Sequence, residues 1–125
     1  MDRIVTERAP TAIGPYSQAI RQGEWIFTSG QIPIDPATSA LVDGDFDAKA
    51  RQVFENLRAV LQAAGADFGD VVKATVYLTD LGDFQALNAV YAEYFADNKP
   101  ARSTVGVAQL PLGSPVEIDL VAHRG

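Results

Sequence analysis

Cysteine is absent from this 125-residue chain, and histidine occurs once, as His123. Without cysteine the chain can form no disulfide and no thiolate metal site, and Cys–His nucleophilic chemistry is excluded. A Ser–His–Asp triad would have to use His123, which lies so close to the chain end that a surface role is its usual one. The sequence also lacks closely spaced zinc ligands and a glycine-rich phosphate loop. Any chemistry must therefore use carboxylates, arginine, hydroxyl groups and backbone amides.

Long apolar segments are also missing. No uninterrupted apolar run approaches the ~18 residues that a membrane-spanning helix needs. The N-terminal stretch MDRIVTERAP has scattered charges and lacks the apolar region of a signal peptide. The expected location is therefore the cytoplasm, with no membrane partner.

Basic residues are few and scattered. Ten Lys and Arg stand against 16 Asp and Glu, which gives a net charge of −6, and no two basic residues are adjacent. Nucleic-acid binding usually requires a basic stripe that neutralises phosphates and releases counterions. The charge pattern argues against nucleic acid as a main partner, although one well-placed arginine can still bind a small anion.

The residues that are present predict a single α+β domain spanning residues 1–125, since one core typically takes ~100–150 residues. The clearest element is a helix from Asp45 to Gly65, where apolar residues recur at three- and four-residue spacing. Asp45 can cap its start, and Gly65 suits the left-handed conformation that ends a helix. A second amphipathic helix is predicted at 84–96.

Strands are expected at 3–6, 18–21, 25–29, 71–78, 103–108 and 116–122. The segment 32–44 carries two prolines and a glycine and is expected to be loop. The order β-β-β-α-β-α-β-β predicts a mixed β-sheet with the two helices packed on one face.

Two charged residues in the last strands are candidates for chemistry. Arg102 opens an otherwise apolar strand, and Glu117 alternates with Val116 and Ile118, so it faces the other side of its strand. One interpretation is a one-sided sheet whose polar face meets water. The other is that the guanidinium and the carboxylate share a cleft, either within the chain or at a subunit boundary, where arginine binds a carboxylate bidentately and glutamate activates water. The alternation is compatible with both.

Several motifs, in the same order and at the same intervals, resemble the Rid (YjgF) family over essentially the whole chain. The matching segments are Gly14-Pro15-Tyr16-Ser17-Gln18-Ala19, Ser29-Gly30-Gln31-Ile32-Pro33, Asn56-Leu57 to Gly65, Val72 to Leu78, the helix from Phe84 to Phe95 with Asn88, Ala101-Arg102-Ser103-Thr104-Val105 and Val116-Glu117-Ile118-Asp119.

The resemblance implies a chorismate-mutase-like α+β fold and a homotrimer with three clefts at subunit interfaces. It implies that Arg102 binds a substrate carboxylate and that Glu117 positions or activates water. It also implies that the pocket is lined by Tyr16, Ser29, Gly30, Asn88 and Thr104. Many relatives have cysteine where this chain has Thr104, so a nucleophilic or redox-regulated thiol is excluded at that position.

The implied activity is hydrolysis of reactive 2-imino acids, 2-iminopropanoate and 2-iminobutanoate, to 2-oxo acids and ammonia. It needs no metal and no organic cofactor, because imines already hydrolyse in water. Some relatives are described as single-strand endoribonucleases that inhibit translation, and others as chaperone-like proteins. The scattered basic residues argue against the nuclease, whereas a chaperone requires an exposed apolar patch that the sequence leaves open.

Overall fold

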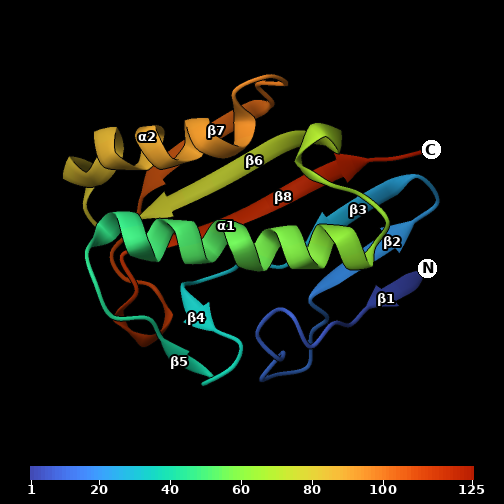
Figure 1. Cartoon of the computed structure of the whole chain (residues 1–125), viewed down its shortest axis with the longest axis horizontal. Coiled ribbons are helices and arrows are strands. Elements are labelled where there is room, and N and C mark those ends of the chain that lie inside the picture. The colour runs from blue at the N-terminus through green and yellow to red at the C-terminus, as the bar shows by residue number, and fades with distance from the viewer.

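The computed structural model describes residues 1–125 and contains one main sheet, two α-helices and a small hairpin (Figure 1). The strands are β1 (Asp2–Ile4), β2 (Ala19–Gln22), β3 (Trp25–Thr28), β4 (Ile34–Asp35), β5 (Ala40–Leu41), β6 (Val71–Leu78), β7 (Ala101–Gly106) and β8 (Val116–His123). The helices are α1 (Phe46–Ala63) and α2 (Phe84–Phe95), with short 3-10 turns at Phe68–Asp70, Leu81–Asp83 and Pro111–Gly113.

The main sheet is mixed and has the order β1-β2-β3-β8-β6-β7. Only the β6–β7 pair is parallel, and α2 forms the connection between these two strands. The last strand in sequence, β8, lies between β3 and β6 in the centre, and β7 is an edge strand. The β2–β3 hairpin turns at Gly23, whose φ of 60° is one that glycine adopts without strain. The mixed sheet predicted from the sequence is therefore confirmed.

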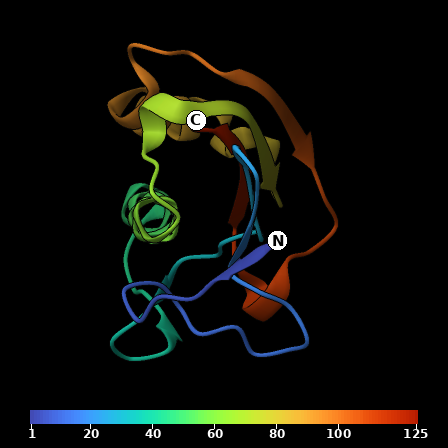
Figure 2. The ribbon, with the colours of Figure 1, turned by 90° about the vertical axis from the view of Figure 1, so that its right-hand side faces the viewer.

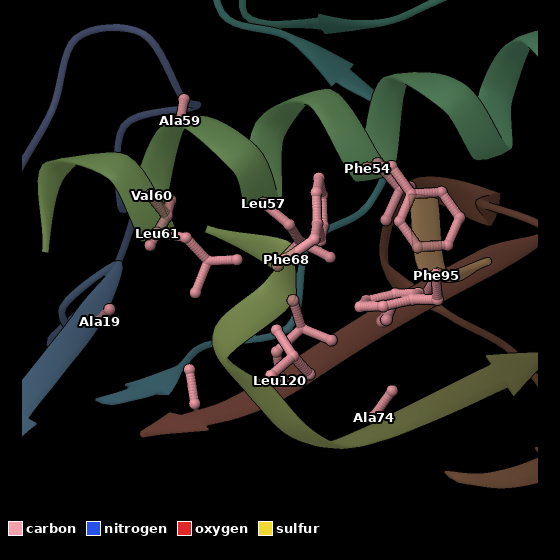
Figure 3. Close-up of a cluster of buried hydrophobic side chains, with 14 of the residues drawn as sticks. Ala19, Phe54, Leu57, Ala59, Val60, Leu61, Phe68, Ala74, Phe95 and Leu120 are labelled. Carbon is pink, nitrogen blue, oxygen red and sulfur yellow. The ribbon is translucent and has the colours of Figure 1, made fainter. Parts of the chain in front are cut away.

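Helix α1 begins and ends where the sequence predicts. The Asp45 side chain accepts a hydrogen bond from the Ala48 backbone N–H at 3.0 Å, and Gly65 follows the helix with a φ of 87°. The buried stripe of α1 packs against the sheet through residues such as Leu57 and Leu61 (Figure 3). Figure 2 looks along α1 and shows it to one side of the sheet.

Both helices cover the same face of the sheet. Alternate residues of β6 and β8 are fully or almost fully buried, and they join side chains from α1 and α2 in one cluster of 25 buried hydrophobic residues. The intervening residues lie on the opposite, open face and stay partly exposed. At one end of the cluster Phe54 lies against aromatic rings from α2 and from Phe68. The open face is where the strands keep polar groups.

Two expectations from the sequence need correction. The segment 32–44 is not all loop, because Ile34 pairs with Leu41 and Asp35 with Ala40 to form the β4–β5 hairpin. The strand expected at 103–108 lies at Ala101–Gly106, so Arg102 is inside it. Pairing with β6, which the sequence pattern does not contain, sets these bounds. No helix combines the length and apolar composition needed to cross a membrane.

Candidate functional site

Arg102 and Glu117 lie on opposite faces of the sheet. Arg102 pairs with Ala74 of β6, and Glu117 pairs with Tyr77 of the same strand. Paired residues on adjacent strands point to the same side, and successive residues of a strand alternate. Ala74 is buried under the helices, so Arg102 lies on the helix face, whereas Tyr77 and Glu117 lie on the open face. Within one chain the two charges therefore do not share a cleft.

Glycine at position 30 allows the backbone to approach the Glu117 side chain. A Cβ atom at this position would lie 2.5 Å from Glu117 Oε2 and 2.8 Å from its Cδ. The approach is fixed by a pair of backbone hydrogen bonds between Gln31 and Ile118, at 2.9 and 3.2 Å. Gly30 does not have a positive φ, so close approach, not a tight turn, requires glycine here.

The Glu117 carboxylate has no hydrogen-bond or salt-bridge partner in the chain. Partial burial raises its pKa, and the nearby charge of Asp119 raises it further. Burial likewise raises the pKa of Asp119, although a hydrogen bond from the Tyr77 hydroxyl, at 3.0 Å, opposes the shift. The result is a carboxylate with free acceptor oxygens and greater basicity than an exposed glutamate.

A cavity of about 560 Å³ opens beside Glu117. Tyr16, Ser29, Gly30 and Glu117 line it, so four of the predicted site residues meet here. The remaining lining is mixed and includes the apolar side chains of Ile13, Ile32, Ile34 and Leu112. The arrangement suits a small ligand with a polar end near Glu117 and an apolar end near the loops.

Hydrogen bonds from buried side chains hold the loops around this cavity. The Ser29 hydroxyl donates to the Ser17 carbonyl, so its own proton is used inside the chain. The buried Gln18 amide donates to the carbonyls of Thr6 and Pro10, at 3.0 and 2.7 Å. The Asn56 amide of α1 donates to the Ile34 carbonyl at 2.9 Å. These residues shape the cavity wall and are satisfied within the chain.

Arg102 lies against one face of α2. Its guanidinium carbon is 4.7 Å from the centre of the Tyr91 ring and 5.6 Å from that of Phe84. Asn88 lies between these two on the same helix face, since spacings of four and three residues place side chains one above another. Arg102, Asn88 and Tyr91 line a second, more open cavity of about 510 Å³. Arg102 forms no salt bridge, so its charge is free for an anion.

Thr104 is on the same side of β7 as Arg102, two residues further along the strand, opposite buried Val76. Its Oγ1 atom is buried and has no hydrogen-bond partner. The Tyr91 hydroxyl, also buried without a partner, is the other such atom in the chain. Buried polar groups are normally paired, so the unpaired Thr104 hydroxyl marks a place where a ligand or another chain can complete the bonding.

The structure thus divides the predicted site residues into two groups. Glu117, Gly30, Ser29 and Tyr16 surround one cavity, and Arg102 and Asn88 line the other. Sequence reasoning missed three neighbours of these groups, which are Tyr77 beside Glu117 and the rings of Phe84 and Tyr91 beside Arg102. The strand alternation placed Asp119 on the face of Glu117, but Phe84 and Tyr91 resembled ordinary apolar stripe residues.

Known proteins resemble this chain over its whole length. The family described as Endoribonuclease L-PSP matches residues 6–124. A RutC family protein of Pyrococcus horikoshii is 53% identical over 121 residues, covering 97% of this chain and 96% of the relative. A 2-iminobutanoate/2-iminopropanoate deaminase of Salmonella typhimurium is 48% identical over 124 residues, covering 97% and 96%. The crystal structure of E. coli TdcF with bound serine has a TM-score of 0.94 and 44% identity, with full coverage of both chains.

Proposed function

Because this chain belongs to the Rid (YjgF) family, we propose that it hydrolyses 2-iminopropanoate and 2-iminobutanoate to the corresponding 2-oxo acids and ammonia. The observation that carries the proposal is the pair of unpartnered charges, Arg102 and Glu117. A 2-imino acid presents a carboxylate for the first and an electrophilic carbon, attacked by water, for the second. The activity named for the Salmonella relative and the serine bound in TdcF support a small substrate with a carboxylate.

Arg102 binds the substrate carboxylate through two N–H donors, which fixes the imine carbon in place and lowers the entropic barrier. Glu117 accepts a proton from water as the water oxygen bonds to that carbon. The π electrons of the C=N bond move to the nitrogen, which takes this proton, and an amino alcohol forms. The hydroxyl proton is then transferred to the nitrogen as the C–N bond breaks, so that the C=O bond forms and ammonia leaves. The raised pKa of Glu117 suits this role, because a stronger base takes the proton more readily.

The separation of the two charges supports a site built from two copies of the chain. We propose a chorismate-mutase-like homotrimer in which the edge strand β7 of one subunit brings Arg102 to the Glu117 cavity of the next. The open face of the sheet exposes Trp25, Phe27 and Val105, at 45, 48 and 41%. An apolar group of this kind is buried when another subunit covers it. Tyr16, Ser29, Gly30, Asn88 and Thr104 would then line one cleft.

The reaction is tested with a coupled assay in which a pyridoxal-phosphate dehydratase acting on serine generates iminopropanoate in situ. Addition of the purified chain should accelerate release of 2-oxopropanoate beyond the spontaneous rate, in proportion to enzyme concentration. A matched preparation of Arg102→Ala controls for contaminating activity. A rate equal to that of the buffer alone would rule the activity out.

Assembly of the site between subunits is tested by complementation. Differently tagged Arg102→Ala and Glu117→Gln chains are co-expressed, and doubly tagged trimers are isolated, with light scattering to establish the mass. Each variant alone should be nearly inactive. In a closed trimer that contains both variants, only one cleft combines an intact Arg102 with an intact Glu117, so activity should return in about a third of the clefts. No recovery in confirmed mixed trimers would show that a cleft does not combine Arg102 and Glu117 from different subunits.

The nuclease activity in the family's description finds less support in this chain. Its net charge is −6, and its one histidine, His123, lies on the surface beside Glu24, with 3.0 Å between Nε2 and Oε2. A polyanionic substrate would be repelled by this field. Measuring RNA cleavage in the same homogeneous preparations distinguishes the two activities.

A further inference from the structure

We infer that Phe84 and Tyr91 are positioning residues whose ring faces hold the Arg102 guanidinium where it receives the substrate carboxylate. The inference rests on the proposed function of Arg102 as the carboxylate-binding residue. It adds two residues of α2 that touch Arg102 and whose effect on substrate passes through that arginine.

The rings contact the guanidinium from one helix face. Phe84 and Tyr91 are seven residues apart, which is close to two helical turns, so both rings project from the same side of α2 toward β7. The ring centres lie 5.6 and 4.7 Å from the guanidinium carbon, within the range of a cation–π interaction. A long, flexible arginine side chain is therefore held at two points by a rigid element.

This mode of holding leaves the hydrogen-bonding capacity of Arg102 unused. The contacts depend on the charge of the guanidinium, and no side-chain or backbone acceptor in the chain takes a hydrogen bond from it. A carboxylate partner from the protein would position the arginine equally well, but it would compete with the substrate carboxylate for the same donors. Aromatic rings orient the group without occupying its donors.

At Tyr91 the ring, and not the hydroxyl, is the part that contacts Arg102. The Tyr91 hydroxyl is buried and unpaired, a condition that costs free energy without contributing to the contact. Tyr91→Phe therefore retains the proposed interaction, whereas Tyr91→Leu removes it while keeping an apolar side chain. Phe84→Leu removes the contact between the Phe84 ring and the guanidinium.

The same helix supplies a matched control in Tyr94. Its ring is also partly buried, and it also lies under an arginine, with 5.3 Å between the Arg58 guanidinium carbon and the ring centre. Tyr94 does not contact Arg102. Tyr94→Leu therefore removes a comparable ring and comparable packing from α2 but should leave the Arg102 guanidinium held.

The experiment measures KM and kcat for iminopropanoate, binding of 2-oxobutanoate by calorimetry, and Tm for all four variants. Loss of a cation–π contact of ~0.5–2 kcal/mol corresponds to about 2- to 30-fold weaker binding. Tyr91→Leu and Phe84→Leu should raise KM and the Kd of 2-oxobutanoate within this range, with a smaller change in kcat. Tyr91→Phe, which keeps the ring, should have the wild-type KM. Tyr94→Leu should lower Tm at least as much as Tyr91→Leu does, with no change in KM.

A double-mutant cycle separates positioning from general packing. In an Arg102→Ala background, Tyr91→Leu should have no further effect on 2-oxobutanoate binding, because the group that it positions is gone. Equal KM in wild type, Tyr91→Leu and Phe84→Leu would overturn the inference, and so would an equal rise in Tyr94→Leu.

Binding also separates this inference from the deaminase proposal. If the wild-type chain binds 2-oxobutanoate but does not accelerate imine hydrolysis, the proposed reaction fails while the binding series still tests the aromatic contacts. Absence of binding by the wild-type chain would overturn both.

Discussion

Two clusters each combine an arginine with the rings of one phenylalanine and one tyrosine of α2 or its neighbours, but they differ in how the arginine is bonded. At one, Arg58 lies 5.3 Å from the ring centres of Phe68 and Tyr94, and it forms a salt bridge with Glu55 at 3.0 Å. Glu55 also accepts a hydrogen bond from the Tyr94 hydroxyl at 2.8 Å. At the other, Arg102 lies over Phe84 and Tyr91 and has no carboxylate partner.

The difference distinguishes a cluster whose polar groups are bonded within the chain from one whose polar groups are unpaired. Around Arg58 the donors and acceptors are used inside the chain, and burial together with the bond to Glu55 raises the pKa of Tyr94 to about 12. Around Arg102 the Tyr91 hydroxyl is unpaired. The Glu117 carboxylate also lacks a partner, but it lies on the other face of the sheet. We refer to these as the closed cluster (Arg58, Glu55 and Tyr94) and the open set (Arg102, Tyr91 and Glu117).

Replacing each arginine by alanine should give the largest difference in activity between the open set and the closed cluster. Arg102→Ala should nearly abolish deamination, since two charge-assisted hydrogen bonds of ~1.5–3 kcal/mol each correspond to about 10²–10⁴-fold in kcat/KM. Arg58→Ala should leave kcat/KM unchanged and lower Tm slightly. Steady-state kinetics on both variants, with circular dichroism to check folding, tests the contrast.

Replacing Arg102 by lysine tests whether a positive charge alone is sufficient. Arg102→Lys keeps the charge but lacks the planar fork, so it should recover little activity. Wild-type turnover by a folded, trimeric Arg102→Ala protein would remove the carboxylate anchor from the mechanism.

The second largest difference in turnover is expected between substitutions of Glu117 and Glu55. Glu117→Gln keeps the shape of the side chain but not its basicity, so imine hydrolysis should fall by ~10²–10⁴-fold while 2-oxobutanoate binding to Arg102 persists. Glu55→Gln, in the closed cluster, should leave turnover unchanged. Kinetics and calorimetry on the same preparations measure both effects, and unchanged turnover in Glu117→Gln would exclude the water-activating role.

Displacing Glu117 without changing it should have a smaller effect. In Gly30→Ala the new methyl group would meet the carboxylate at 2.5 Å and push it aside. Misplacement by about 1 Å can cost ~10²-fold, so a loss of about 10- to 100-fold in kcat is expected. Gly69→Ala is the control, because a Cβ there meets nothing within 4 Å and the position does not have a positive φ. Equal kcat in the two alanine variants would show that the close approach has no catalytic role.

Patterns along one segment predicted the fold well. The Asp45 cap, the Gly65 end of α1 and the span of β6 could be predicted because capping residues and local periodicity determine them. The side of the sheet on which Arg102 lies could not be predicted, because it depends on pairing with β6 and not on the pattern of its own strand. The β4–β5 hairpin was missed because its strands are only two residues long.

The same limit applied to the candidate site. Alternation alone placed Glu117 on the polar face of β8, and the structure agrees. The contact between Glu117 and Gly30 joins segments far apart in the sequence, so the need for glycine could be recognised only from the distance. Tyr91 and Tyr94 look alike on an amphipathic stripe, and only the structure shows which arginine each contacts.

The smallest expected effect is on stability, where the two Glu→Gln changes should have opposite signs. Glu55→Gln removes an exposed ion pair worth ~0.2–1 kcal/mol and should lower Tm at pH 7. Glu117→Gln should raise Tm at pH 7. Partial burial and Asp119 raise the folded-state pKa of Glu117 above its ordinary value of 4.5, so its stabilising proton is lost as pH rises through that higher pKa. Thermal melts from pH 3.5 to 8 at one protomer concentration measure both signs.

The direction of the Glu117 effect follows from the pH window. Near pH 3.5 the carboxyl is mostly protonated in both the folded and unfolded states, because its pKa is 4.5 when unfolded and higher when folded, so glutamine and glutamic acid should give similar Tm values. Above the raised pKa the folded protein carries a half-buried charge beside Asp119, and glutamine removes this cost. In a trimer the neighbouring subunit's Arg102 would offset part of that charge, so the gain should be larger in an Arg102→Ala background than in wild type. A lower Tm for Glu117→Gln at pH 7 in the Arg102→Ala background would mean that Glu117 has another partner and belongs to a closed cluster.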